Sequence, residues 1–160
     1  MQIDYLMNHQ ELLPSLARLH YEQWTHLRPG ESLEARTSRL RSYLGRRGIP
    51  TALVALDQSA LLGSALLLAK DLDTHPHLSP WLAGVYVLPK FRRHGIATAL
   101  VSRIIDEARS LGTRTLYLYT ASAERFFSRL GWSVMEHAAF HDTPVAVMSY
   151  EIAVSTDSPA

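Results

Sequence analysis

Hydrophobic and polar positions in the middle of the chain change from one period to another. Residues Trp81–Val87 are almost all apolar and include β-branched valines, which predicts a buried strand. Pro89 ends this strand because proline has no N–H to donate to a β-ladder. From Ile96 the apolar residues recur at helical spacing as far as Gly112, which is placed to end the helix. The pattern predicts a strand, a short turn and a long amphipathic helix.

The same two periods predict the other elements of a single α/β domain. Ser32 and Ser122 are the predicted N-caps of the second and the last helix. Two neighbouring runs, Thr51–Leu56 and Leu61–Ala69, are apolar on consecutive positions, so helices should cover both faces of their sheet. The remaining elements are strands at Gln2–Met7, Thr113–Tyr119, Ser133–Phe140 and Pro144–Ile152, and helices at 10–24, 32–45 and 122–130. The domain is expected to span residues 1–152, followed by a flexible tail at 153–160.

Composition and charge exclude several classes of function. A net charge of +1 over 160 residues argues against a general nucleic-acid binder, which carries a basic face. The sequence has no cysteine, which excludes disulfides, thiolate zinc sites and a cysteine nucleophile. His75, His77, His137 and His141 lack the spacing of a metal site, so no metal is expected. No apolar run is long enough to cross a membrane and no secretion signal is visible, so we expect a cytoplasmic protein.

The turn before the long helix has the features of an anion-binding site. Lys90, Arg92, Arg93 and His94 precede Gly95, and residues 75–105 contain no Asp or Glu to offset these charges. The first turn of a helix has N–H groups without intrahelical partners and a positive dipole, which favours bound phosphate. A plain strand-to-helix connection with solvated charges is the alternative.

A second basic stretch lies on the predicted helix after Ser32. Arg36, Arg39 and Arg41 share the helix face opposite to the leucines. We interpret them as a solvated helix face. The alternative is a face that steers an acidic or anionic substrate.

Two blocks of sequence resemble the signatures of the GNAT superfamily of N-acyltransferases. The first is Val85-Tyr86-Val87-Leu88-Pro89 followed by Arg92-Arg93-His94-Gly95-Ile96-Ala97. The second, Thr120–Trp132, is similar to the downstream signature with its aromatic pair and Leu-Gly-aromatic end. The resemblance implies a mixed, mostly antiparallel sheet of about seven strands with helices on both faces, splayed between its fourth and fifth strands. It also implies acetyl-CoA as the default acyl donor and a primary amine as the acceptor, and dimers are common among such relatives.

The family's donor site carries over onto both blocks. The backbone of Tyr86, Val87 and Leu88 would hold the pantetheine, and the N–H of Val87 would stabilise the oxyanion that develops on the thioester. Phe126 and Phe127 would wall the acyl-CoA site together with Thr120. The pyrophosphate loop corresponds to Arg92, Arg93, His94, Gly95, Ile96, Ala97 and Thr98.

The second block departs from the family at two positions. Thr120 stands where many members have Asn, and Phe127 stands where many have the Tyr that protonates the leaving thiolate. Phe127 has no proton to give, so the general acid is open. Tyr119 or Tyr117 on the neighbouring strand could replace it, with packing on the strand face as the alternative for each.

The general base and the acceptor pocket are also open at this level. Catalysis needs a base for the attacking ammonium, or a water chain in its place. Candidate bases are Glu22, Glu34, Asp71, Asp73, His75, His141 and Asp142. Trp24, with His20 and Tyr21 beside it, and Trp81 could line the pocket for the amine, with core packing as the alternative.

The sequence therefore predicts an acyl-CoA-dependent N-acyltransferase. Direct attack of the amine in a ternary complex is expected because no cysteine can carry the acyl group. The alternative is a binding or sensor module that keeps the CoA site without turnover, which the absence of a Tyr at Phe127 would favour. A dinucleotide-binding enzyme is poorly supported, because its three-glycine turn should follow an early strand.

Overall fold

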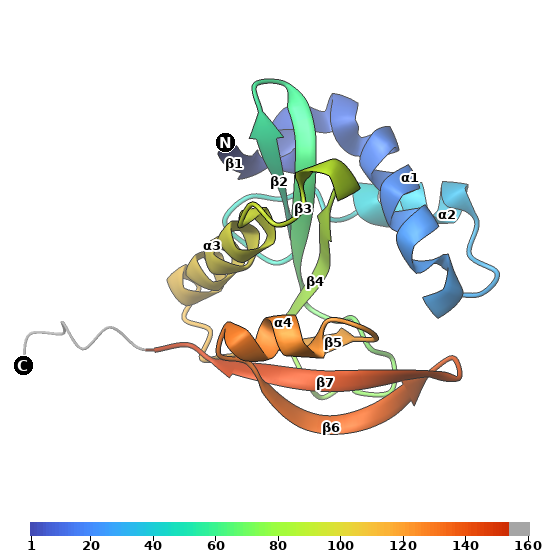
Figure 1. Cartoon of the computed structure of the whole chain (residues 1–160), viewed down its shortest axis with the longest axis vertical. Helices are drawn as coiled ribbons and strands as arrows, with labels where there is room; N and C mark the ends of the chain where they lie inside the picture. Colours follow the sequence, from blue (N-terminus) through green and yellow to red (C-terminus); the bar gives the residue numbers. More distant parts are fainter. Residues whose placement is uncertain (154–160) are drawn as a thin grey trace, which may run out of the picture.

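The computed structural model describes residues 1–153 of the chain, and Figure 1 shows their arrangement. Seven strands form one sheet, and helices lie on both of its faces. The strands are β1 Gln2–Tyr5, β2 Thr51–Asp57, β3 Ala60–Leu68, β4 Trp81–Val87, β5 Thr115–Thr120, β6 Ser133–Phe140 and β7 Thr143–Glu151. The α-helices are α1 Leu13–Trp24, α2 Leu33–Arg41, α3 Ile96–Ser110 and α4 Glu124–Arg129. Short 3₁₀ turns occupy Leu6–Leu12, Thr25–Leu27 and Pro89–Phe91.

The sheet divides between β4 and β5. Its order is β1-β2-β3-β4-β5-β7-β6, and every pairing is antiparallel except the parallel one between β4 and β5. These two strands pair only at Trp81 and Tyr117, where the Tyr117 N–H donates to the Pro80 carbonyl at 3.1 Å. Beyond that point the two strands diverge. Helices α1, α2 and α3 lie with β1–β4, and α4 lies with β5–β7 (Figure 1). The splay expected between the fourth and fifth strands is confirmed.

Strand β2 shows why both faces of the sheet are covered. Leu53 and Ala55 are fully buried in the cluster that contains α3, whereas Ala52, Val54 and Leu56 are fully buried in the cluster that contains α1. Alternate residues of a strand point to opposite faces, so a strand that is apolar at every position needs a helix on each side. The consecutive apolar pattern predicted this arrangement.

Helix α3 begins and ends at glycines. Gly95 precedes it with a φ of +78°, and Gly112 follows it with a φ of +79°. The Gly112 N–H donates to Arg109 O at 3.0 Å and the Thr113 N–H to Ala108 O at 3.1 Å, which together form a Schellman motif. Leu100 and Ile104 are fully buried beneath the sheet. Both the predicted central strand and the predicted start of the helix are confirmed.

Some local predictions hold and others do not. The Ser32 hydroxyl accepts from Ala35 N at 3.0 Å, as expected of an N-cap. The predicted Ser122 cap is wrong, because Thr120 Oγ1 accepts the amides of Ser122 and Ala123 at 3.4 and 2.9 Å before the helix starts. Most of the tail predicted at 153–160 lies outside the described residues. Among residues 1–153, no helix combines the length and apolar character needed to span a membrane.

Candidate active site

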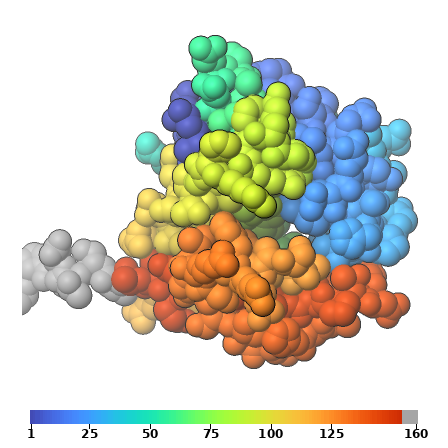
Figure 2. All heavy atoms as spheres, in the orientation of Figure 1, coloured from blue at the N-terminus to red at the C-terminus, as the bar shows by residue number. Residues whose placement is uncertain are grey.

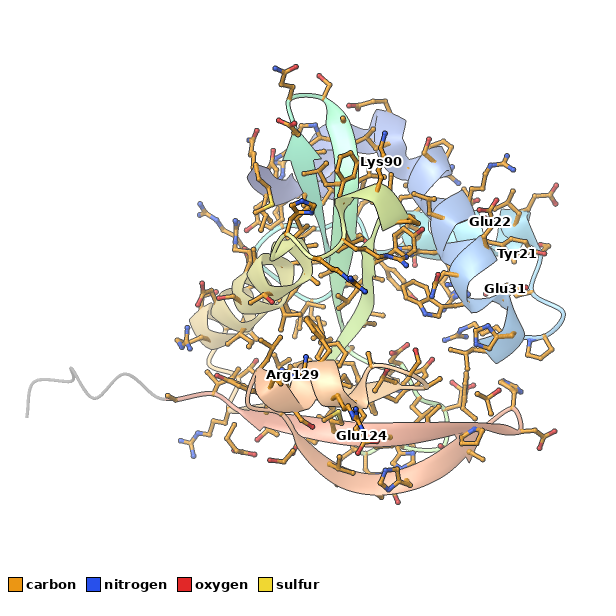
Figure 3. All side chains as sticks on the ribbon, in the orientation of Figure 1. Tyr21, Glu22, Glu31, Lys90, Glu124 and Arg129 are labelled. Atoms are coloured by element: carbon orange, nitrogen blue, oxygen red, sulfur yellow. The ribbon has the colours of Figure 1, made fainter. Side chains whose placement is uncertain are left out.

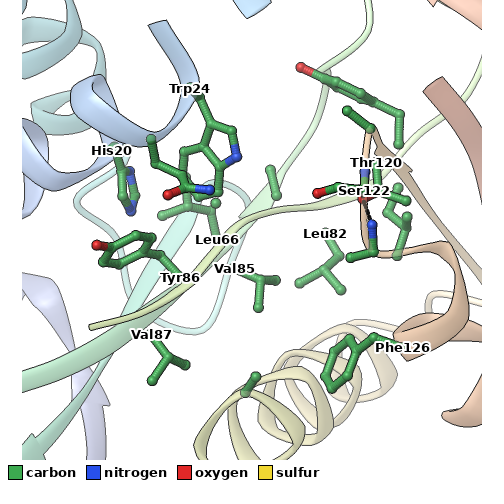
Figure 4. A pocket seen from close by; sticks show the side chains of 18 of the residues that line it. His20, Trp24, Leu66, Leu82, Val85, Tyr86, Val87, Thr120, Ser122 and Phe126 are labelled. Atoms are coloured by element: carbon green, nitrogen blue, oxygen red, sulfur yellow. Dashed lines mark hydrogen bonds between the residues drawn. The ribbon is translucent and has the colours of Figure 1, made fainter. Parts of the chain in front are cut away.

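A cavity of about 750 Å³ occupies the gap between the diverging strands. Figure 2 shows the hollow between α1, the segment that leads into α3, and α4. His20 and Trp24 lie on one side of it, Thr120, Ser122 and Phe126 on the other, and β4 runs between them (Figure 4). The cavity has a donor end, formed by the start of α3 and by α4, and a polar end, formed by α1, α2 and the loop after β3.

A bulge on β4 turns its backbone out of the ladder beside the cavity. Ser64 pairs with Tyr86 and Leu66 with Ala83, so the one β3 residue between these pairs opposes two residues of β4, Gly84 and Val85. Gly84 lies within the bulge at a φ of +57°, and a Cβ there would meet the Leu66 side chain at 2.7 Å. Bulges re-aim strand groups, and here the affected residues, Gly84 and Val85, line the cavity.

A buried hydrogen-bond relay holds this bulge. The Ser64 hydroxyl donates to Gly84 O at 2.8 Å, and because it has a single proton it must accept from His20 Nε2–H, also at 2.8 Å. Burial, with the positive charges of Arg36 and Arg39, lowers the pKa of His20 to about 3. His20 is therefore neutral near pH 7, with its proton on Nε2, and its contact with Ser64 is structural rather than acid–base.

The donor end contains the predicted anion site. The helix start at Gly95 leaves the amides of Ile96, Ala97 and Thr98 without intrahelical partners, and all three residues line the cavity. Arg93 lines it beside them. These donors and the positive helix end form a cradle that suits a phosphate.

Arg92 has a second role at this end. Its Nε donates to Val87 O at 2.8 Å, and its guanidinium lies 5.5 Å from the centre of the Tyr86 ring. The side chain thus ties the turn back onto the end of β4, while its remaining N–H groups can face the cavity. His94 is exposed, with Nδ1 beside Phe91 O at 3.1 Å, and neither it nor Leu88 lines the cavity.

Helix α4 supplies an aromatic wall. Phe126 and Phe127 make an edge-to-face pair with centroids 5.0 Å apart, and both line the cavity with Thr120. Phe127 is buried against Trp132, with centroids 6.0 Å apart. The wall is apolar and has no hydroxyl at Phe127, as the sequence predicted.

The polar end brings together groups that are far apart in the sequence. Asp71 lines the cavity and lies 3.8 Å from the Arg28 guanidinium. Burial raises the pKa of Asp71 to about 6, although the charges of Arg28, Arg39 and Arg36 act in the opposite direction. Burial also raises the pKa of Tyr119, and the negative charge of Asp71 adds to this effect. A carboxylate that titrates near neutrality and a protonated phenol therefore share one end of the cavity.

Two arginines of α2 face inward, which corrects an expectation. Arg36 is buried, with Nε donating to Glu31 Oε1 at 2.5 Å, and Arg39 donates to the same oxygen at 3.1 Å. The solvated face predicted for α2 is therefore wrong at Arg36 and Arg39, although Arg41 is exposed. The carboxylate that pairs them, Glu31, precedes the helix, so the helical pattern alone gave no sign of it.

Aromatic residues of the predicted acceptor pocket divide into two groups. Trp24 lines the cavity and makes T-shaped contacts with His20 at 5.0 Å and Tyr86 at 6.0 Å. Trp81 is fully buried, donates Nε1–H to Leu78 O at 2.7 Å and packs against Tyr117. The expectation that Trp81 lines the acceptor pocket is wrong, because its ring belongs to the core.

The predicted acid and base candidates also divide into residues that line the cavity and residues that do not. Tyr119 and Asp71 line the cavity, and Asp71 is the sole carboxylate to do so among residues 1–153. Tyr117 does not line it. His141 is exposed in the β6–β7 turn, outside the cavity, so the geometry gives no support to a catalytic role there. The other candidates, Glu22 (labelled on α1 in Figure 3), Glu34, Asp73, His75 and Asp142, also lie outside the cavity lining.

Sequence reasoning missed Ser64, Gly84 and Arg28. A glycine inside a strand pattern is a signal for a bulge, and Gly84 could have been identified in this way. Ser64 is one polar residue within an apolar strand, which suggests a buried hydrogen bond without naming its partner. Arg28 lies in a Pro-Gly turn, and only the folded chain places it beside Asp71.

Comparison with known proteins agrees with this geometry. The model of the acetyltransferase (GNAT) family matches residues 12–132, which is most of the chain, and the chain therefore belongs to this family. A sequence search of curated proteins finds no significant match.

Solved structures share the fold. An aminoglycoside 6'-N-acetyltransferase complexed with coenzyme A has a TM-score of 0.77 at 19% identity, covering 98% of this chain and 100% of its own. The aminoglycoside 6'-N-acetyltransferase from Enterococcus faecium has a TM-score of 0.74 at 21% identity, covering 98% and 100%. A ribosomal-protein-alanine N-acetyltransferase from Brucella melitensis has a TM-score of 0.72 at 20% identity, covering 94% and 99%.

Proposed function

We propose that this protein is an acetyl-CoA-dependent N-acetyltransferase whose donor and acceptor meet in the cavity between β4 and β5. The observation that carries the proposal is the meeting of three features at this cavity. These are the β4 bulge at Gly84, the unpaired amides at the start of α3, and the polar end around Asp71. Membership of the GNAT family supports the same reaction class.

The donor would bind along the diverging strands. Its pyrophosphate fits the amides of Ile96, Ala97 and Thr98 and the charges of Arg92 and Arg93. Its pantetheine would follow the end of β4, and Phe126 and Phe127 offer an apolar wall on the other side. The cradle itself supports this placement independently of any solved structure, because anions are stabilised where helix N–H groups and cations converge.

The chemical step needs an oxyanion donor, a base and an acid. The Val87 N–H is our candidate for polarising the thioester carbonyl, because β4 presents its backbone to the cavity just past the bulge. Asp71 is the candidate base, since a pKa of about 6 leaves it ionised at neutral pH and able to accept a proton from the ammonium. Tyr119 is the candidate acid for the thiolate, since its raised pKa keeps it protonated.

Transfer would be direct. The chain has no cysteine, so the amine nitrogen would attack the acetyl carbonyl itself, and the C–S bond would break as the C–N bond forms. The base takes the proton that leaves the nitrogen, and the thiolate receives one from Tyr119 or from water. Initial-rate patterns should therefore show both substrates bound before product leaves.

One assay tests the proposal. Release of free thiol from acetyl-CoA should rise above its background rate for at least one member of a panel of amino acids, peptides, polyamines and aminoglycosides. CoA binding by calorimetry, measured on the same preparation, completes the assay. Binding without thiol release across the panel would contradict the enzyme and favour a CoA-binding sensor, and absence of binding would contradict both.

A further inference from the structure

The polar end of the cavity contains more positive than negative charge. Arg28, Arg36 and Arg39 line it, and Asp71 is the carboxylate that lines it with them. Glu31 adds one negative charge behind Arg36 and Arg39. Three guanidiniums thus face two carboxylates, because Arg36 and Arg39 share Glu31, and this partly buried place keeps an excess of one positive charge.

Arg39 shows where this charge is unsatisfied. One of its terminal nitrogens donates to Glu31 Oε1 at 3.1 Å, whereas its Nε is buried and has no hydrogen-bond partner among residues 1–153. Arg36 already uses its Nε on the same Glu31 oxygen at 2.5 Å. A buried guanidinium N–H without an acceptor is costly. The Arg39 side chain is 24% exposed and lines the cavity, so a planar anion there would pair with the terminal N–H groups that Glu31 does not use.

The contact between Arg28 and Asp71 is also loose. Their closest atoms are 3.8 Å apart, which is beyond hydrogen-bond distance. Both groups therefore keep donor or acceptor capacity for a third species. An ammonium would suit Asp71, and a carboxylate would suit the arginines beside it.

We propose that the acceptor amine carries a carboxylate, and that it is an α-amino acid with an apolar or aromatic side chain. Its ammonium faces Asp71, and its carboxylate binds Arg39 with help from Arg28. Its side chain packs on the wall formed by Trp24 and Tyr86, whose rings make a T-shaped contact at 6.0 Å. This inference rests on the proposed acetyl transfer and names the acceptor class for it.

The same charges disfavour polycations. Each additional ammonium of an aminoglycoside or polyamine would meet arginines at this end, with a single carboxylate to receive it. Like charges that share a cavity of low dielectric constant repel more strongly than they do in water. The fold is shared with aminoglycoside acetyltransferases, but the charge of this cavity points to a different acceptor.

The test compares amino acids with their amides, which differ only in the carboxylate, and adds kanamycin as a polycationic acceptor. L-phenylalanine, L-methionine, their amides and kanamycin are each titrated into CoA-loaded protein by calorimetry, and each is assayed for thiol release from acetyl-CoA. The free acids should bind and turn over with kcat/KM at least about tenfold above their amides and above kanamycin.

Arg39→Gln supplies the second arm. It should raise KM for the free acid about tenfold or more and leave KM for the amide within about twofold, whereas a merely structural defect would affect both acceptors equally. Arg39→Lys should recover part of the preference. Arg41→Gln, an exposed arginine on the same helix, is the matched control and should leave both values unchanged.

The outcomes separate the two proposals. Equal or better binding and turnover of the amides or kanamycin would overturn the carboxylate inference and leave acetyl transfer standing. Loss of CoA binding, or absence of turnover with every acceptor, would count against the proposed function, and in the latter case the binding arm alone still decides the acceptor class.

Discussion

The Ser64 hydroxyl on β3 donates a hydrogen bond of 2.8 Å to the carbonyl oxygen of Gly84 in the β4 bulge. The same hydroxyl accepts a hydrogen bond of 2.8 Å from the Nε2–H of His20 on α1. One buried hydrogen-bond relay thus joins α1, β3 and the bulge of β4. The bulge aims the backbone of β4 into the cavity, so the relay positions the surface on which the proposed reaction takes place.

Removing the hydroxyl should affect both stability and catalysis. Ser64→Ala leaves Gly84 O and His20 Nε2 without partners in the interior, which should lower the free energy of unfolding by about 1–3 kcal/mol. It should also lower kcat/KM for acetyl transfer, because the β4 bulge loses the hydrogen bond that fixes Gly84 O. Chemical denaturation and initial rates measure the two effects. Ser102→Ala, exposed on α3, is the control, and matching values for both variants would show that the relay is not needed.

Asp71 should determine the acid side of the pH–rate profile. A base must be ionised to accept a proton, so kcat/KM should rise with pH through about 6 and then level off. Asp71→Asn should lower kcat and remove this limb. Asp73→Asn on the same loop should retain it. If the acid limb of the kcat/KM profile is unchanged in Asp71→Asn, the base is another group or the acceptor itself.

The same variant should change stability in a pH-dependent way. Folding raises the pKa of Asp71 from 3.8 to about 6, so its ionised form opposes folding. This penalty is absent below the unfolded pKa of 3.8, grows as pH rises from there to the folded pKa of about 6, and is constant above it. Asp71→Asn should therefore be more stable than the parent by on the order of 2–3 kcal/mol at pH 8, with little difference at pH 3.5. Equal stability at both pH values would show that the carboxylate is not desolvated.

Tyr119 and Phe127 test the identity of the acid. Tyr119→Phe removes the phenol that lines the cavity and should lower kcat roughly ten- to a hundredfold, with the acetyl-CoA Kd unchanged. Phe127→Tyr should recover turnover in that background if proton delivery to the thiolate limits the rate. Tyr117→Phe, on the same strand but outside the cavity lining, is the matched control. A kcat that none of these changes alters would make water the proton source.

Much of the fold followed from the order of apolar runs. Trp81–Val87 and the helix start at Ile96 were predicted correctly because strand and helix periods meet at Pro89 and Gly95, whose backbone constraints are local. The β2–β3 hairpin followed from two apolar runs across a short polar turn. Hydrophobic periodicity does not predict the splay between β4 and β5, which came from the family resemblance.

Errors arose where a distant partner decides the role of a residue. Ser122 looked like a cap, but Thr120 Oγ1 takes both amides. Arg36 looked solvated because Glu31 lies outside the helical repeat. Asp71 was one of several candidate bases, and only the folded chain buries it beside Arg28 while leaving His141 on the surface. The alternative interpretation of the α2 arginines, an anionic substrate, is the one that their inward position favours.

The central claim is that the start of α3 and the end of β4 hold acetyl-CoA. Calorimetric titration of CoA into the protein and into the Arg92→Glu, Gly95→Asp double variant tests it most directly. The variant places two carboxylates where Arg92 and the cradle amides now meet the cavity, while Arg114→Glu, exposed before β5, controls for charge reversal elsewhere. We predict saturable binding to the parent and to the control, and affinity at least about tenfold weaker for the double variant. Equal CoA affinity in all three proteins, or no binding to the parent, would contradict the account.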